Sequence, residues 1–211
     1  PLSVMIRLYV GVIRPRRIRV LGQEFAGVID AIGPGGTDRA AHRFTVGDRV
    51  VGRTDFRMGA YADYLCTPAV PPSDSGAIAP IPANLSFDEA VAIPLGGLEA
   101  IKFLRRANVQ PGERVLVVGA GGSIGTMAIQ LAKRTGAVVT AVDAAAKLDA
   151  IRSIGADRVV DYAATDPFAD GERYDVVFDV VGTARLRQLT AALAAGGRLI
   201  LSNPSMRQMV R

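Results

Sequence analysis

Four glycines lie close together near the middle of the chain, where a backbone turn could contact phosphate groups. They follow the apolar, β-branched run Val115–Gly119, which is typical of a strand buried on both faces of a parallel sheet. Beyond them, apolar residues recur every three or four positions from Ile124, as in a helix with one apolar face. Such a turn lets the backbone approach a pyrophosphate, whose charge the free N–H groups of the helix's first turn can hold. The pattern predicts a dinucleotide site, although a strand–helix turn without a ligand would also use glycine. The candidate contacts are Gly119, Gly121, Gly122, Ser123, Ile124 and Gly125.

An acidic residue, Asp143, ends the next predicted strand, 18 residues beyond Gly125. A carboxylate at this place can accept hydrogen bonds from the adenosine ribose, and its charge would repel a 2′-phosphate. Lys147, four residues later, could instead attract such a phosphate. We therefore expect NAD(P)H as cofactor, with a preference for NADH. The alternative is that Asp143 caps a helix and Lys147 is a solvated side chain.

Metal chemistry is not expected, because the chain has one histidine, His42, and one cysteine, Cys66. A catalytic zinc commonly needs three protein ligands and a structural zinc four. We interpret Cys66 as a small apolar residue on a strand and His42 as a loop residue. A single cysteine also excludes an intrachain disulfide and fits a reducing, cytoplasmic location.

Composition limits the partners of this 211-residue chain. Hydrophobic residues make up 49% and charged residues 21%, which is the balance of a globular protein with a core. The net charge is +5, but the arginines are scattered and no recognition motif accompanies them, so nucleic acid is not expected as a partner. No apolar run of about 18 residues is present, so no membrane span is expected. A small-molecule substrate is the expected partner.

The elements that would position the candidate residues alternate between helix and strand from Ser86 onward. Ser86 and Glu89 form a predicted capping box that starts a short helix ending near Ala92. Alternating strands and helices predict a doubly wound parallel sheet covered by helices on both faces, without a sixth strand. The predicted strands are 115–119, 137–142, 158–160, 174–180 and 198–201, and the later helices are 97–107, 148–154 and 184–194, the last stopped by Gly196 and Gly197.

Residues 1–83 show short alternating segments separated by glycine-rich turns, which predict a small barrel-like β domain. Strands are expected at 27–33, at the end of 44–52 and at 59–66. The segment 68–82 contains five prolines and is predicted to be a surface connector. We therefore expect two domains, 1–84 and 85–211.

Several of these segments resemble motifs of the medium-chain dehydrogenase/reductase superfamily. The glycine turn and the segments 154–157 and 160–162 resemble those of its zinc-independent quinone oxidoreductase branch, which includes proteins of the reticulon-4-interacting type. Gln23 stands where the zinc-dependent relatives place a histidine. The resemblance implies a GroES-like β domain, here partial, and a Rossmann domain, with the active site between them. The motifs are LGQEFAGV at Leu21–Val28, VGDRV at Val46–Val50, GAYADY at Gly59–Tyr64 and GAGGSIG at Gly119–Gly125.

The resemblance also implies where the chain departs from the family. It begins inside the catalytic domain and ends after the fifth Rossmann strand. The outer edge of that strand has no later segment to pair with, and apolar residues near the start need a partner: Leu8, Tyr9, Val10, Val12 and Ile13. We therefore expect that this chain alone is not the functional unit and that missing segments of the same polypeptide, or a second chain, cover these edges. Glu99 stands where many quinone oxidoreductases carry a threonine near the nicotinamide. Dimers of the family form near the outer Rossmann edge, which implies a homodimer for the full-length protein.

Further cofactor contacts follow from strand ends and from the resemblance. Tyr162 resembles a family tyrosine on the adenosine side of the cofactor, although loop packing would explain it equally. The turns after the fourth and fifth strands should border the nicotinamide, and Asn203 has turn formation before Pro204 as its alternative. These turns contain Val181, Gly182, Ser202 and Asn203.

Taken together, the residues and the resemblance predict a zinc-independent NAD(P)H-dependent oxidoreductase, which by the resemblance transfers hydride to a quinone, an activated alkene or a carbonyl. No residue stands out as a proton donor, so no catalytic residue is predicted. The alternative is a nucleotide-binding redox sensor or structural protein without turnover.

Overall fold

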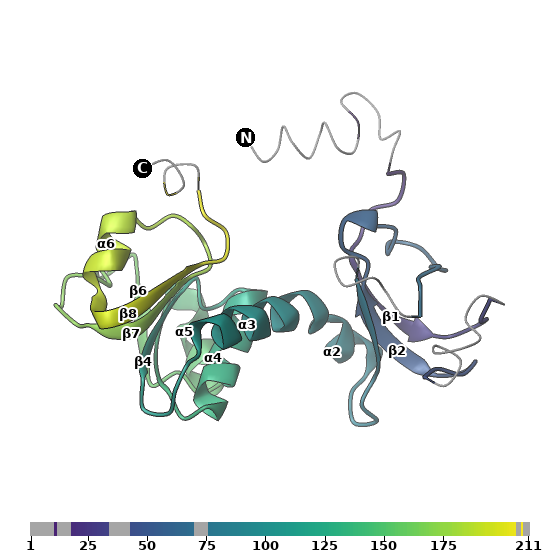
Figure 1. Cartoon of the computed structure of the whole chain (residues 1–211), viewed down its shortest axis with the longest axis horizontal. Coiled ribbons are helices and arrows are strands. Elements are labelled where there is room, and N and C mark those ends of the chain that lie inside the picture. Colours follow the sequence, from purple (N-terminus) through teal and green to yellow (C-terminus); the bar gives the residue numbers. More distant parts are fainter. Residues whose placement is uncertain (1–10, 12–17, 34–42, 70–75, 206–207, 209–211) are drawn as a thin grey trace. The chain divides into compact units, whose positions relative to one another are not determined.

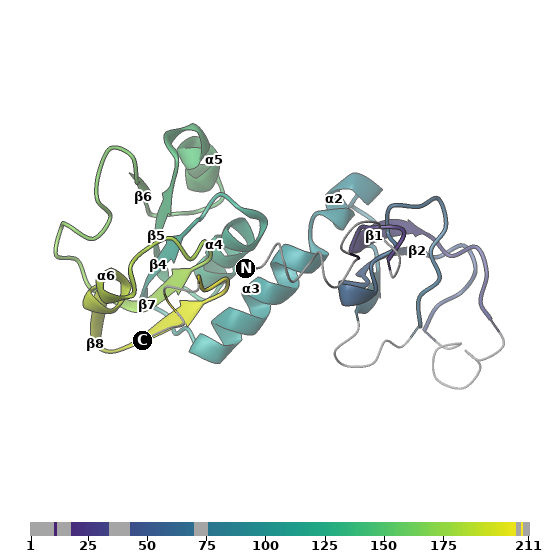
Figure 2. The same ribbon diagram turned by 90° about the horizontal axis from the view of Figure 1, so that it is seen from above.

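The chain forms two compact units, Pro1–Pro94 and Leu95–Arg211, shown in Figure 1 and, from above, in Figure 2. The structure is a computed structural model that describes residues 11, 18–33, 43–69, 76–205 and 208. His42 and the apolar residues between positions 8 and 13 lie outside this range. The domain boundary expected between residues 84 and 85 stays a prediction.

The second unit is built on a five-stranded parallel sheet, in the order β6-β5-β4-β7-β8. The chain therefore runs outward from β4 in one direction and then returns to continue on the other side of it. This reversal creates a crevice at the carboxyl ends of β4 and β7, as in doubly wound sheets. The strands are β4 (Arg114–Val118), β5 (Val138–Asp143), β6 (Arg158–Asp161), β7 (Tyr174–Asp179) and β8 (Leu193–Leu201).

Helices cover both faces of this sheet, because its strands are apolar on both sides (Figures 1 and 2). In β4, Val115 and Val117 pack into one core and Leu116 and Val118 into the other. Three helices contribute to the first core: α3 (Pro94–Ala107), α4 (Ser123–Arg134) and α5 (Leu148–Ser153). The helix α6 (Leu186–Ala191) packs on the opposite face through Leu189.

The end of this unit differs from the sequence-based expectation. The helix predicted at 184–194 is shorter, and β8 begins at Leu193 rather than at Arg198. Gly196 and Gly197, predicted to stop a helix, lie inside β8, where the register with β7 shifts between Tyr174 and Val176. Gly196 has a φ of +75°, so the pair permits an irregularity within the strand. At the other end, α3 begins at Pro94, three residues before the expected start.

The first unit contains an antiparallel sheet in the order β1-β2-β3, formed by β1 (Glu24–Val28), β2 (Arg49–Arg53) and β3 (Ala77–Pro80). A short 3-10 helix, η2 (Asp55–Arg57), follows β2. The helix α2 (Phe87–Val91) begins at the predicted capping box. The Ser86 hydroxyl accepts from the Glu89 N–H at 3.2 Å, and Glu89 accepts from the Ser86 N–H at 2.8 Å.

Four expectations for this unit were wrong. The predicted strand 27–33 lies earlier, as β1, and ends at Val28. The segment 59–66 contains a bend at 61–63 instead of a strand. Tyr61 and Tyr64 are both 78% exposed, so no face of the alternating pattern is buried. Cys66 is accordingly exposed and outside any strand. The proline-rich connector contains β3 near its end.

The two kinds of sheet confirm the α/β fold class, with a doubly wound parallel sheet and a smaller β unit. None of the helices in the described part of the chain is long and apolar enough to span a membrane.

Candidate functional site

A groove of about 730 Å³ opens along the carboxyl ends of β4, β5 and β7. It lies at the reversal of the strand order, where doubly wound sheets bind their ligands. Six of the predicted cofactor residues line it: Gly119, Gly122, Asp143, Lys147, Tyr162 and Val181.

The glycines of the turn have different surroundings. Gly119 has a φ of +83°, and a Cβ there would overlap Val181. A Cβ on Gly125 would overlap the carbonyl oxygen of Gly119, so Gly125 allows the helix to pack against the turn. At Gly122 the nearest atom to an added Cβ, the Gly119 carbonyl oxygen, is 3.7 Å away, which is an ordinary van der Waals contact. Unlike Gly119 and Gly125, Gly122 could therefore carry a Cβ without overlap, and its exposed surface is available to a ligand.

The start of α4 is open to an anion. Gly122 is the N-cap residue, with φ −90° and ψ 170°, and no side chain caps the helix. The N–H groups of the first turn, from Ser123 to Gly125, have no intrahelical carbonyl to bind. Gly96 of α3 fixes the position of this turn, because a Cβ on it would lie 2.6 Å from the Ser123 carbonyl oxygen. Ile124 points elsewhere and packs against the core.

Asp143 joins the glycine turn to the end of β5. Its Oδ2 accepts a hydrogen bond from the Gly121 N–H at 2.7 Å, and its Oδ1 accepts from the Ala144 N–H at 2.8 Å. Lys147 places its Nζ 3.3 Å from Oδ1, and its aliphatic stem covers Gly121. The N-cap of the following 3-10 helix is Ala144, so the capping alternative for Asp143 was wrong.

The electrostatics of this corner keep Asp143 ionised. Burial by itself would raise the pKa of Asp143, whose side chain is only 9% exposed. Hydrogen bonds from the N–H groups of Ala144 and Gly121, and the Lys147 ammonium, outweigh burial, so the pKa lies below its ordinary value. A carboxylate oxygen has two lone pairs, and among the described residues Oδ2 accepts one hydrogen bond. Asp143 thus retains both charge and acceptor capacity at the groove.

The segment after β6 forms another wall of the groove. The Tyr162 N–H donates to the carbonyl oxygen of Asp143 at 3.3 Å, and its side chain is 59% exposed. The wall continues through Thr165 to Phe168. Sequence reasoning did not single out this loop, because its residues follow no motif and acquire their position only from the fold.

The turns after β7 and β8 lie against each other. Gly182 has a φ of +76°, and a Cβ on it would overlap the carbonyl oxygen of Asn203. The Ser202 N–H donates to the Asp179 carbonyl at 3.0 Å. Val181 lines the groove, whereas Gly182, Ser202 and Asn203 do not. Thr183, Ala184 and Gln188 line it as well, although sequence reasoning did not name them.

The residues that the structure describes do not fit a zinc site. The Gln23 amide, at the place of the family histidine, donates to the carbonyl oxygen of Asp55 at 3.0 Å. No group of three or more His, Cys, Asp or Glu side chains gathers anywhere among the residues that the structure describes.

The hydrogen-bonding groups around the groove, by contrast, fit a dinucleotide. An uncapped helix start, an exposed glycine at its N-cap and an ionised carboxylate at the neighbouring strand end surround one crevice.

Comparison with known proteins shows which family this chain resembles. Residues 123–203 match the family described as zinc-binding dehydrogenase. The chain is 34% identical over 190 residues to the pikromycin polyketide synthase component PikAII of Streptomyces venezuelae, covering 86% of this chain and 5% of that protein. It is also 34% identical over 167 residues to the trans-enoyl reductase pgmF of Aspergillus terreus, covering 76% and 45%.

A solved structure extends the match to the whole chain. The crystal structure of an NAD-dependent alcohol dehydrogenase superposes with a TM-score of 0.76 and 30% identity, over 99% of this chain and 68% of that one. This chain spans less than half of the length of the two curated relatives named above. The shared fold and identity establish that the chain belongs to the medium-chain dehydrogenase/reductase superfamily.

Proposed function

We propose that this chain is the nucleotide-binding part of a zinc-independent, NAD(P)H-dependent oxidoreductase that reduces an activated alkene, a quinone or a carbonyl. One observation carries the proposal: the uncapped start of α4 and the Asp143 carboxylate face the same groove. A dinucleotide's adenosine half is recognised by its pyrophosphate anion and its ribose. The N–H groups at the start of α4 complement the pyrophosphate, and the Asp143 carboxylate complements the ribose.

The proposed cofactor lies across the carboxyl edge of the sheet. Its pyrophosphate would contact the backbone at Gly122 and Ser123, and its adenosine ribose would donate hydrogen bonds to Asp143. Tyr162 would border the adenosine side. The second half of the dinucleotide would extend over β7, past Val181 and toward the turn at Asn203, since it must leave the glycine turn in that direction.

Asp143 favours NADH in this proposal. Its charge opposes a 2′-phosphate, and Lys147 offsets that charge only in part because it is half exposed and pairs with Asp143. NADPH is accordingly tolerated but not preferred.

The substrate class is supported by chemistry and by the names of relatives. When bound, the reduced nicotinamide supplies the hydride, and the protein orients it and excludes water. The residues of this chain are proposed to bind and orient, and none of the described side chains is assigned as a proton donor. A trans-enoyl reductase among the relatives favours an alkene conjugated to a carbonyl.

The proposal extends to the setting of the full-length protein. A cytoplasmic location is supported by the single cysteine, and a homodimer is supported by the family resemblance. Neither nucleic acid nor membrane is a proposed partner.

A cofactor-oxidation assay tests the function. NADH or NADPH is mixed with the full-length protein and with an α,β-unsaturated ketone, a quinone or an aldehyde, and loss of the reduced-nicotinamide absorbance is followed. We expect turnover with at least one acceptor, faster with NADH than with NADPH. Tight NADH binding without turnover for all three would favour the alternative, a nucleotide-binding sensor or structural protein. Absence of nucleotide binding would reject both.

A further inference from the structure

A second hydrogen-bonded cluster lies behind the turn that closes the groove at β7. Its centre is Asp179, the last residue of β7, whose side chain is fully buried. Oδ1 of Asp179 accepts hydrogen bonds from the N–H groups of Val181 at 3.1 Å and Gly182 at 2.9 Å. Oδ2 accepts from the Gln208 amide at 3.0 Å. The three donors are all neutral groups.

A buried carboxylate held by neutral donors is unfavourable unless each donor is well placed, because burial opposes the charge. Loss of one donor would leave that charge less compensated. The position of Val181 and Gly182 is therefore tied to the charge of Asp179 and to the presence of Gln208.

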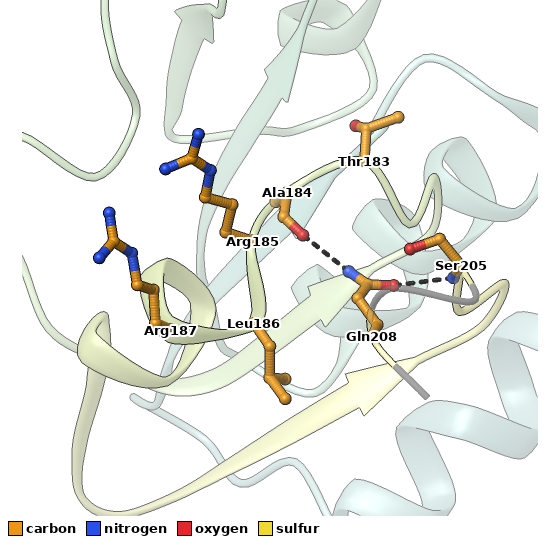
Figure 3. A pocket seen from close by; sticks show the side chains of 7 residues that line it. All are labelled: Thr183, Ala184, Arg185, Leu186, Arg187, Ser205 and Gln208. Atoms are coloured by element: carbon orange, nitrogen blue, oxygen red, sulfur yellow. Dashed lines mark hydrogen bonds between the residues drawn. The ribbon is translucent and has the colours of Figure 1, made fainter. Parts of the chain in front are cut away.

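The side-chain amide of Gln208 makes three hydrogen bonds in this cluster, two as donor and one as acceptor. Its Nε2 donates to Asp179 and also to the Ala184 carbonyl at 2.8 Å, while its Oε1 accepts from the Ser205 N–H at 3.0 Å. Figure 3 shows the amide between Ala184 and Ser205. Two donors and one acceptor on one planar group are specific to an amide side chain. Gln208 is only 7% exposed, so water does not replace these bonds easily.

The cluster joins two turns that come from neighbouring strands. Val181, Thr183 and Ala184 belong to the turn after β7 and line the groove. Ser205 belongs to the segment after β8 and lines a smaller cavity of about 460 Å³ together with Gln208, Thr183 and Ala184. The segment Thr183–Ala184 is thus a wall shared by the groove and this cavity, and Gln208 holds it from behind.

We propose that Asp179 and Gln208 are positioning residues for the half of the dinucleotide that lies over β7, and this inference rests on the proposed function. They act through the turn Val181–Ala184 and do not touch the adenosine half, which lies over β4 and β5. Their loss should therefore weaken NADH binding and leave AMP binding unchanged.

The test compares two nucleotides on the full 211-residue chain. NADH contacts both halves of the proposed site, whereas AMP contacts only the adenosine half. For Q208L, which removes all three hydrogen bonds, we expect the affinity for NADH to fall at least fivefold and that for AMP to stay within twofold. Q130L is the matched control, since Gln130 is exposed on α4 and its amide donates to the Thr126 carbonyl alone among the residues that the structure describes. Both affinities of Q130L should stay within twofold of the wild type.

An exchange of the two groups gives an independent readout. D179N places an amide N–H against the Gln208 amide, and Q208E places two carboxylates together, so each should weaken NADH binding. D179N/Q208E restores a donor–acceptor pair and should bind NADH more tightly than either single variant. Parallel loss of NADH and AMP binding in Q208L, no change in either, or failure of all the variants to fold would overturn the inference. A wild-type protein that binds neither nucleotide would reject the proposed function itself and this inference with it.

Discussion

At the scale of single residues, two glycines of one turn are expected to fail in different ways when a side chain is added. A Cβ on Gly122 would make only an ordinary contact, at 3.7 Å, so Gly122→Val should leave the fold intact but place its methyl groups where the pyrophosphate is proposed to lie. We expect at least a tenfold loss of NADH affinity with little change in melting temperature. Fluorescence titration and thermal unfolding measure the two effects.

Gly125→Ala is the matched variant, because its Cβ would overlap the Gly119 carbonyl oxygen. It should lower the melting temperature, in contrast to Gly122→Val. A folded Gly122→Val protein with wild-type affinity would contradict the pyrophosphate assignment.

The charge of Asp143 should decide between the two nicotinamide cofactors. Replacing Asp143 by Ser removes the charge that opposes a 2′-phosphate and leaves Lys147 unpaired to attract it. We expect NADPH binding to improve relative to NADH binding by about 1–3 kcal/mol, the scale of one charge contact in a partly exposed pocket. Competitive titration gives the ratio. A wild-type protein that already prefers NADPH strongly would refute this role of Asp143.

At the scale of elements, a strand could be predicted where both of its faces are buried, because a short run of apolar residues then identifies it. The run Val115–Gly119 identified β4 because β-branched residues fill both faces of the sheet. The glycine pair inside β8 was misinterpreted because a local pattern cannot distinguish a helix stop from a strand irregularity. The strand β3 was missed because its pairing with β2 arises from a partner distant in sequence, while Pro80 and the prolines on either side of the strand indicate a connector.

An ion pair ties β8 to the turn before β4 and gives a prediction at this scale. The Arg198 guanidinium donates to both carboxylate oxygens of Glu113, at 2.9 and 2.5 Å, and this contact lowers the pKa of Glu113. Glu113→Gln should lower the free energy of unfolding by about 1 kcal/mol, a modest value because the Arg198 side chain is 36% exposed. Urea unfolding measures it.

The control for this pair is Asp149→Asn. Asp149 pairs with Arg152 on the surface and is 99% exposed, so its replacement should change stability by less than about 0.5 kcal/mol. Equal effects of the two substitutions would show that the Glu113–Arg198 pair contributes no more than a surface contact.

At the scale of the whole molecule, acid should destabilise the protein through carboxylates that hold the sheet together. Lys133 and the Val139 N–H outweigh burial, which by itself would raise the pKa of Asp157, and lower that pKa, as their counterparts do for Asp143. A folded pKa below the unfolded one means that the contribution is present above the ordinary value of about 3.9 and is lost as the pH falls through the folded pKa.

We therefore expect the melting temperature to fall as the pH is lowered below about 4, and this fall to be smaller in Asp157→Asn. Lowering the pH should still unfold the variant, since Asp143 and Glu113 also have lowered pKa values. A melting temperature that is independent of pH in this range would contradict the account.

Only the part of the site that follows short-range sequence patterns could be predicted from the sequence. The glycine turn and Asp143 follow a fixed spacing around one strand–helix unit, and the fold brings both to one groove. Asp179 was not singled out, although an acidic residue ending a buried strand was a signal. Its contact with Gln208 joins residues 29 positions apart and arises only from the packing of two turns.

The measurement that tests the central claim most directly is a map of backbone amide chemical shifts in the ¹⁵N-labelled protein as NADH is added. The account predicts the largest changes in Gly119–Gly125, Asp143–Lys147, Tyr162 and Val181–Ala184, which surround the groove at the carboxyl edge of the sheet. Saturable changes confined to other parts of the chain, or no changes at all, would contradict it.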